Sequence, residues 1–140
     1  MSKVLTIASA AACVALLAAS PLKAETVNLK ANLSPSEEVP PTNSKGSGSV
    51  TATYDTASKK LSWQGSYKDL SGPATAAHFH SGEKGKNGGV AIPIAPATSP
   101  LKGEATLNDQ QAADLMAGKL YVNVHTEANK AGEIRGQVTK

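Results

Sequence analysis

The sequence predicts an all-β domain, a Greek-key β-sandwich with one short helix in a crossover between strands. Three observations lead to this fold class. About eight short segments alternate apolar and polar residues with the period of a half-buried strand. Clusters of Gly, Pro, Asn and Ser separate these segments, and the chain holds 12 Gly and 8 Pro. One segment alone has the spacing of an amphipathic helix.

The first 24 residues have the build of a secretory signal peptide. Lys3 supplies a positive charge, residues 7–19 form an apolar run, and Ala24 is the small residue that signal peptidase needs. Because the run is shorter than the roughly 20 residues of a transmembrane helix, we expect no stable membrane span. We therefore expect a periplasmic or secreted protein whose mature part, residues 25–140, is one domain.

Cysteine content and charge narrow the classes of partner. Cys13 is the single cysteine and would leave with the signal peptide, so the mature domain would hold no disulfide. Lipoprotein processing at Cys13 is the alternative, disfavoured because the alanines before it lack the usual leucine. The net charge of +3 falls to about +1 without Lys3 and Lys23. The lysines are scattered, so we expect no nucleic-acid partner.

The first half of the domain is expected to hold a hairpin and one further strand. Three segments alternate apolar and polar side chains: residues 26–33, 46–55 and 60–70. Residues 34–42 contain three prolines, which cannot donate to a ladder, and are expected to form a loop or an edge. Residues 56–59 make the hairpin turn. Trp63 is in phase with Leu61, which predicts a core anchor.

The second half is expected to hold five strands and the helix. The strand segments are residues 74–80, 90–94, 102–107, 119–126 and 132–140. Pro93 confines its strand to an edge or an end. Residues 81–89 are rich in Gly and Lys and are expected to be a turned loop, because no Walker-type motif is present. Residues 108–117 are the helix, with Asn108 as its N-cap and Gly118 as its stop.

All three histidines of the chain lie on two of the expected strands. Side chains alternate between the faces of a strand, so His78 and His80 share one face. His125 shares a face with Tyr121 and Asn123 on the other strand. The opposite faces carry the residues expected in the core: Phe79, Val122 and Val124.

This pattern is typical of a metal site, provided that the two strands are neighbours. Residues on one face of a strand lie about 6.5–7 Å apart, so two imidazoles can reach one ion. Imidazole suits copper and zinc, and we favour copper, with zinc as the alternative, from the Irving–Williams order. Glu127 is a candidate fourth ligand, and Tyr121 and Asn123 are candidates to orient the imidazoles. The competing interpretation is that the histidines are ordinary surface residues.

Several motifs in this order resemble the chordin-type CHRD domain: EEVPP at 37–41, AAHFH at 76–80, NGG at 87–89, GKLYVNVHT at 118–126 and GEIRG at 132–136. The resemblance spans residues 27–138. It implies an immunoglobulin-like or Greek-key β-sandwich in a secreted or periplasmic protein, and it places the three histidines inside the family's motifs. It does not carry growth-factor binding, because the cysteine-rich modules that bind growth factors in the animal protein are lacking here.

The sequence also resembles, more distantly, copper-zinc superoxide dismutase, but lacks its histidine-bearing zinc loop, its disulfide cysteines and a fourth copper histidine. The first functional hypothesis is a copper-binding protein for copper handling or copper-dependent redox chemistry such as superoxide dismutation. Arg135 would be an electrostatic guide in such an enzyme. The second hypothesis is a non-enzymatic structural or adhesive module, which could form a homodimer through an edge strand.

Overall fold

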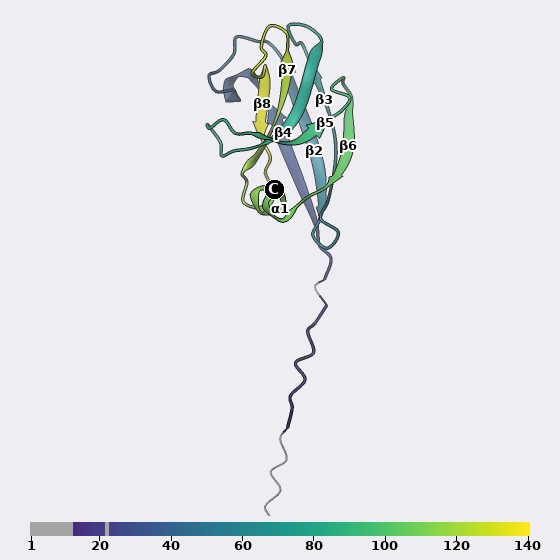
Figure 1. Cartoon of the computed structure of the whole chain (residues 1–140). Coiled ribbons are helices and arrows are strands. Elements are labelled where there is room, and N and C mark those ends of the chain that lie inside the picture. Colours follow the sequence, from purple (N-terminus) through teal and green to yellow (C-terminus); the bar gives the residue numbers. More distant parts are fainter. Residues whose placement is uncertain (1–12, 22) are drawn as a thin grey trace, which may run out of the picture.

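The fold is a sandwich of two antiparallel sheets (Figure 1), as the sequence predicted. A computed structural model describes residues 13–21 and 23–140. The strands are β1 (Thr26–Leu33), β2 (Ser47–Asp55), β3 (Lys60–Lys68), β4 (Ala74–Ser81), β5 (Val90–Ile94), β6 (Leu101–Thr106), β7 (Leu120–Thr126) and β8 (Ile134–Gln137). The helices are α1 (Asp109–Met116) and a 3-10 turn, η1 (Pro35–Glu37), in the proline-rich segment.

The expected signal peptide covers residues 1–24, of which residues 1–12 and 22 lie outside the described part. Residues 13–21 and 23–25 carry no helix or strand. In the part of the chain that the structure describes, no helix is long and apolar enough to cross a membrane.

The strand order shows why the connections cross between sheets. The first sheet has the order β1-β2-β3-β6 and the second has the order β5-β4-β7-β8. The chain therefore changes sheet after β3, after β5 and after β6, and α1 lies in the last of these crossovers, as predicted. On one side, the bridges Lys30–Thr139 and Ser34–Arg135 join β1 to β8 and the residues after it. Strands β5 and β6 are the edges on the other side.

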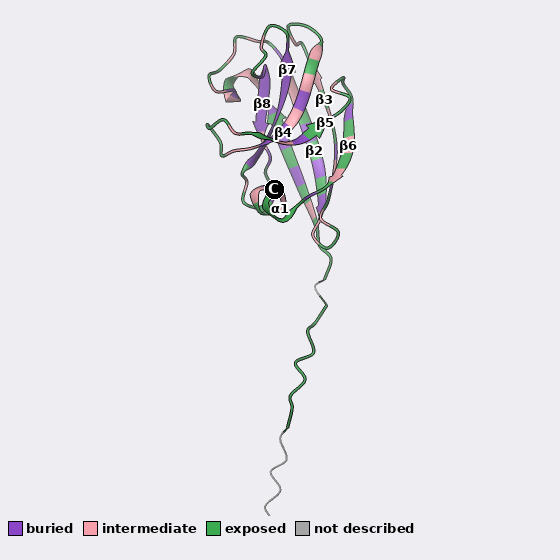
Figure 2. Cartoon of the chain, viewed as in Figure 1, coloured by how far each residue is buried: buried purple, intermediate pink, exposed green. Residues whose placement is uncertain are grey.

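The core lies between the sheets (Figure 2) and is built from alternate residues of each strand. Phe79, Val122 and Val124 are fully buried, which confirms their assignment to the core side. Trp63 packs edge to face on Phe79 with ring centroids 5.1 Å apart. It is therefore the core anchor that its phase predicted, and it ties the first sheet to the second.

The helix begins and ends as its sequence predicts. The Asn108 side chain accepts a hydrogen bond from the Gln111 backbone N–H at 2.8 Å, and the Gln111 side chain accepts one from the Asn108 N–H at 3.0 Å. This is a capping box. Gly118 has φ +73°, a conformation that favours glycine and ends the helix. Leu115 is buried and fastens α1 to the core.

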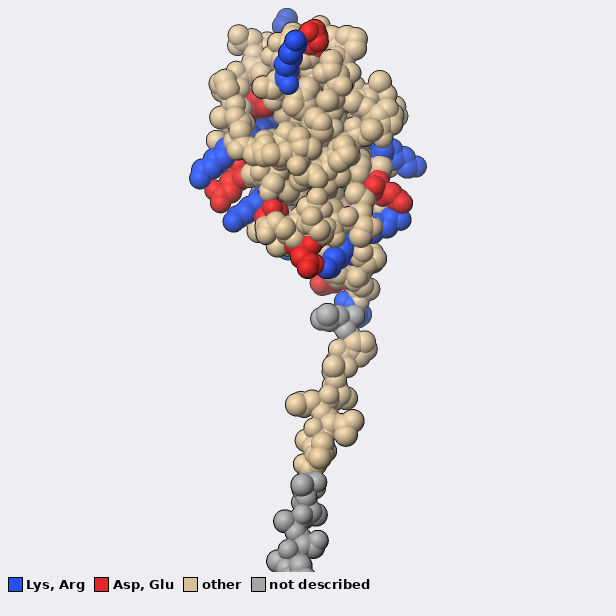
Figure 3. All heavy atoms as spheres, viewed as in Figure 1, with Lys and Arg blue, Asp and Glu red and all other residues tan. Residues whose placement is uncertain are grey.

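The outer faces of the two sheets differ, and this difference positions the candidate site. The outer face of the first sheet is exposed, whereas every residue of β7 is buried. Three loops lie against the outer face of the second sheet: residues 34–46, 82–89 and 127–133. The side chains that alternation placed opposite the core are thus enclosed as well. Figure 3 shows charged residues of both signs interspersed over the face in view.

Candidate metal centre

Strand pairing brings the three histidines together. Strands β4 and β7 are antiparallel neighbours, and their register places Ala76 opposite His125 and His78 opposite Asn123. His125 is therefore diagonal to His78 on the same face of the sheet. His78, His80 and His125 each offer a ring nitrogen, and these nitrogens all lie within 4.8 Å of one another. The neighbouring strands that the sequence pattern required are present.

Backbone carbonyls orient two of the three imidazoles. Nδ1 of His80 lies 3.0 Å from the Gly88 carbonyl oxygen, and Nδ1 of His125 lies 2.8 Å from the Lys130 carbonyl oxygen. A carbonyl only accepts, so each of these Nδ1 atoms carries the proton and each Nε2 keeps a free lone pair. A backbone partner on the far nitrogen is the usual arrangement for a metal-bound histidine.

The third imidazole completes the group from the solvent side. Nδ1 of His78 lies 3.2 Å from Nε2 of His125, so in the metal-free protein His78 donates to His125. His78 is partly exposed, whereas His80 and His125 are only 8% and 9% exposed. Access to the group is therefore by way of His78.

Burial favours the neutral, metal-binding form of two of the imidazoles, those of His78 and His80. Burial, followed by the proximity of His125 and His80, lowers the pKa of His78. Burial also lowers the pKa of His80, against the hydrogen bond to Gly88. Both rings therefore stay neutral to a lower pH than an ordinary histidine, and a neutral imidazole is the ligand form.

Tyr121 packs against the ring of His80 and holds the same loop. The two rings are stacked, with centroids 4.9 Å apart and planes within 4°. The Tyr121 hydroxyl accepts a hydrogen bond from the Gly88 N–H at 3.0 Å. The residue that bonds His80 is thus itself fixed by Tyr121, which lies where the sequence placed it, beside the histidines.

Arg135 is enclosed beneath the 82–89 loop and is only 1% exposed. Its guanidinium lies 3.4 Å from the centre of the Tyr121 ring. It donates to three oxygens of the loop: the Lys86 carbonyl at 2.7 Å, the Glu83 carbonyl at 3.1 Å and Asn87 Oδ1 at 3.2 Å. In this position Arg135 fastens the loop that carries Gly88, and its side chain presents little surface to solvent.

Asn123 and Glu38 form a buried polar pair behind His80. The Asn123 amide lies close to both the Glu38 carboxyl and the His80 ring. Nevertheless Asn123 Oδ1, His80 Nε2 and Glu38 Oε1 have no hydrogen-bond partner of good geometry. Buried polar atoms normally find partners. A cation bound by Nε2 of His80 would give this nitrogen the partner that it lacks. Burial raises the pKa of Glu38 to about 7, against the nearby Arg135 and Asn123.

Glu127 lies away from this group. Its side chain is 82% exposed and its carboxylate is 3.1 Å from the Lys130 ammonium. The cluster of potential ligands within the described residues consists of the three histidines alone.

Glu133, in the turn beside His125, is a buried charged residue that sequence reasoning missed. It is fully buried and its carboxylate accepts hydrogen bonds from Ser71, Ser44, Thr126 and Asn129. Burial alone would raise the pKa of Glu133, but these hydrogen bonds outweigh the effect of burial and lower the pKa to about 2. Alternation in residues 132–140 places Glu133 on the face opposite Ile134 and Val138, away from the core, and Glu38 lies in the proline-rich segment, where no periodicity marks a buried side chain.

Fold and site together define a small all-β sandwich with a three-histidine group that could bind a metal ion. The family model of the CHRD domain matches residues 29–138, which is most of the chain, and the protein belongs to the CHRD domain family. No curated protein and no solved structure matches this chain.

Proposed function

We propose that this CHRD-domain protein is exported and holds copper through His78, His80 and His125. Its function would be copper handling or copper-dependent redox chemistry such as superoxide dismutation. The observation that supports this most is the orientation of the buried imidazoles, because two backbone carbonyls leave the Nε2 atoms of His80 and His125 unprotonated and close to His78.

The three histidines would have different roles in such a site. His80 and His125 form the rigid part, because loops and buried charges hold their rings. His78 is the exposed member and would be the first to meet an incoming ion. Copper bound here would supply one-electron redox chemistry, and the Irving–Williams order favours it over zinc at nitrogen ligands. The Asn123 amide lies beside the His80 ring, and its oxygen has no hydrogen-bond partner, so it would be an additional polar group near the bound ion.

The test is copper and zinc titration of residues 25–140, which contain every helix and strand that the structure describes. We expect one copper per chain, held more tightly than zinc. Each single change His78→Ala, His80→Ala and His125→Ala should lower the affinity for copper by at least about ten-fold. Glu127→Gln is the matched control and should bind as the unchanged protein does. Weak binding, or binding that is indifferent to the histidines, would contradict the proposal.

A superoxide assay at low salt then separates copper handling from catalysis. Dismutation by the copper-loaded protein, absent from the His125→Ala variant, would support an enzyme. Arg135 can be tested in the same assay as an electrostatic guide. If its charge matters, Arg135→Ala should lower the rate more than Arg135→Lys does. An equal fall in both variants would assign Arg135 to positioning the loop.

A non-enzymatic interaction module is the second candidate function. The observation that favours it is the open edge strand β6, which is independent of the histidines. Loss of partner association on changing the β6 edge, in a protein that binds no metal, would support this candidate over the first.

A further inference from the structure

One edge of the sandwich is open to another strand. The β1 and β8 edges are bridged to each other. The β5 edge is five residues long and contains Pro93, which cannot donate to a ladder. The β6 edge has six residues, Leu101–Thr106, without proline, and its central residues are exposed or half-buried. An edge of this kind is a template for pairing with another chain.

We propose that two copies of this chain pair antiparallel along β6, about a two-fold axis at Gly103. In this register Gly103 lies opposite the partner's Gly103, and Lys102 lies opposite the partner's Glu104. The two-fold axis repeats the second contact, so two pairs of opposite charge form on the outer face. Opposite charges directly across an antiparallel pair stabilise it. A closed C₂ pair uses one surface of each copy and leaves no β6 edge exposed.

The sequence of β6 fits antiparallel pairing with a second β6 in this register better than a shifted register, parallel pairing or another edge. A one-residue slip would put Lys102 opposite the partner's Gly103 and would lose both charge pairs. Parallel pairing would place Lys102 beside the partner's Lys102. Lys and Glu on an edge strand ordinarily discourage association, but at this spacing each charge meets its opposite in a second copy. The charges on β6 are therefore complementary to those of a second β6 strand.

The inner face at this edge also fits a second copy. Gly103 is opposite Trp63 in the ladder, and a Cβ on Gly103 would lie 2.6 Å from the indole ring. The ring therefore extends to the β6 edge, where its Nε1–H is buried without an acceptor. Pairing would cover the half-exposed Gly103 and Ala105.

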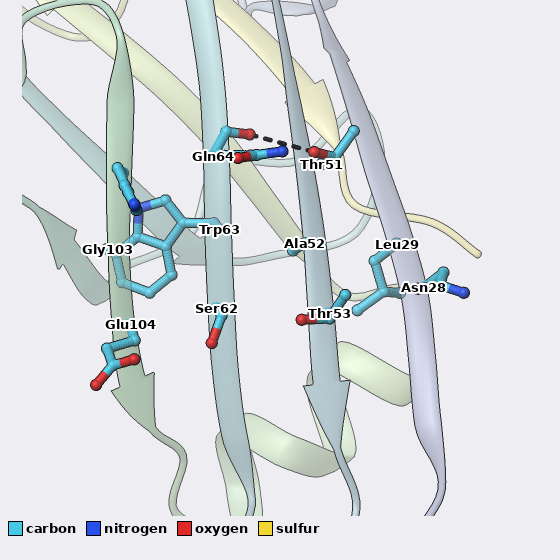
Figure 4. A pocket seen from close by; sticks show the side chains of 11 residues that line it. Asn28, Leu29, Thr51, Ala52, Thr53, Ser62, Trp63, Gln64, Gly103 and Glu104 are labelled. Carbon is cyan, nitrogen blue, oxygen red and sulfur yellow. Dashed lines mark hydrogen bonds between the residues drawn. The ribbon is translucent and has the colours of Figure 1, made fainter.

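The pairing would also enlarge a groove on the outer face of the first sheet. The groove has a volume of about 730 Å³ and crosses the four strands (Figure 4). Its floor is a row of residues paired in register: Leu29, Ala52, Trp63 and Gly103. Because Gly103 lies on the proposed axis, the grooves of two copies would join into one that crosses eight strands.

The test is charge reversal followed by sedimentation equilibrium from micromolar to millimolar concentration, with EDTA present so that no metal bridge contributes. We expect the unchanged protein to dimerise. Lys102→Glu makes both positions acidic and Glu104→Lys makes both basic, so each variant alone should dimerise at least about ten-fold more weakly. An equimolar mixture of the two variants should form a heterodimer, and the double variant Lys102→Glu/Glu104→Lys should recover the homodimer.

Lys68→Glu is the control, because it changes the net charge equally but lies on β3 beyond the segment that pairs with β6. It should leave the dimer intact, and circular dichroism should show that all variants are folded. A protein that remains monomeric at millimolar concentration would overturn the proposal. A dimer whose affinity in both single variants equals that of the unchanged protein would also overturn it, because such a dimer would use another surface. The metal titration above is unaffected by either result.

Discussion

Changing Glu133 to Gln should remove a large part of the free energy of unfolding at neutral pH. It should also remove most of the decrease in that free energy that the unchanged protein shows in acid. The Glu133 carboxylate is fully buried and accepts from Ser71 N at 2.8 Å, Thr126 Oγ1 at 2.8 Å and Asn129 Nδ2 at 2.8 Å, among others. These donors come from the segment between β3 and β4, the last residue of β7 and the turn that follows it. A glutamine amide has about the same shape but presents an NH₂ group to donors that need an acceptor.

The magnitude follows from the pKa of Glu133. This pKa falls from its ordinary value of 4.5 to about 2 on folding, and each pKa unit corresponds to about 1.4 kcal/mol. The ionised carboxylate therefore contributes on the order of 3 kcal/mol to the free energy of unfolding. The lowered pKa gives the sign: this contribution is complete above pH 4.5 and is lost as the pH falls toward 2. The donors left unsatisfied in the variant each cost about 1 kcal/mol or more.

The assay is urea unfolding of residues 25–140 in EDTA, followed by the fluorescence of Trp63, at several values of pH between 2 and 8. We expect Glu133→Gln to lower the free energy of unfolding by roughly 3–5 kcal/mol at pH 7. The difference should shrink toward pH 2, where the wild-type carboxyl is also protonated. A variant that loses less than about 1 kcal/mol at pH 7, or that keeps the full acid slope of the unchanged protein, would refute the reasoning.

Three further changes test other parts of the site. Glu38 has its pKa raised to about 7, so its ionisation lowers the free energy of unfolding as the pH rises from 4.5 to 7. Glu38→Gln should therefore be more stable than the unchanged protein at pH 8, by up to about 3 kcal/mol in the same urea assay. A Cβ on Gly88 would lie 1.5 Å from the Ser81 carbonyl oxygen, so Gly88→Ala should displace the carbonyl that orients His80 and weaken copper binding about ten-fold or more in titration. Arg135→Lys cannot keep three loop contacts at once, so amide hydrogen exchange in residues 82–89 should become faster, and an unchanged pattern would contradict its role as an anchor.

Periodicity in the sequence predicted most of the fold because each strand has one face in the core. Leu29, Leu61 and Phe79 are buried in the phase that alternation requires. Asn108 and Gly118 marked the ends of the helix through capping chemistry, which is local and therefore readable. The same alternation put the histidines on one face, and antiparallel pairing of β4 with β7 then brought them together.

Loop packing could not be predicted in the same way, because it depends on contacts between residues far apart in the chain. Alternation assigned Asn123 and His125 to the face away from the core, where exposure to solvent was the simplest expectation. Both are buried, since loops from other parts of the chain cover this face. Which member of the pair Glu37 and Glu38 would be enclosed is likewise set by the fold and not by local pattern. Glu38 is buried, whereas Glu37 lies near Lys84 at the surface.

Strand β8 and the residue before it show how the buried charges serve the site. Glu133 and Arg135 are two residues apart and so point to the same face of the second sheet. Arg135 holds the loop whose Gly88 carbonyl orients His80. Glu133 binds Asn129 in the turn whose Lys130 carbonyl orients His125. One cation and one anion, each with its hydrogen bonds satisfied, thus fix the two rings before any ion arrives. Under the proposed function, holding these rings in advance would reduce the conformational entropy that metal binding costs, which gives the two buried charges a physical role in so small a domain.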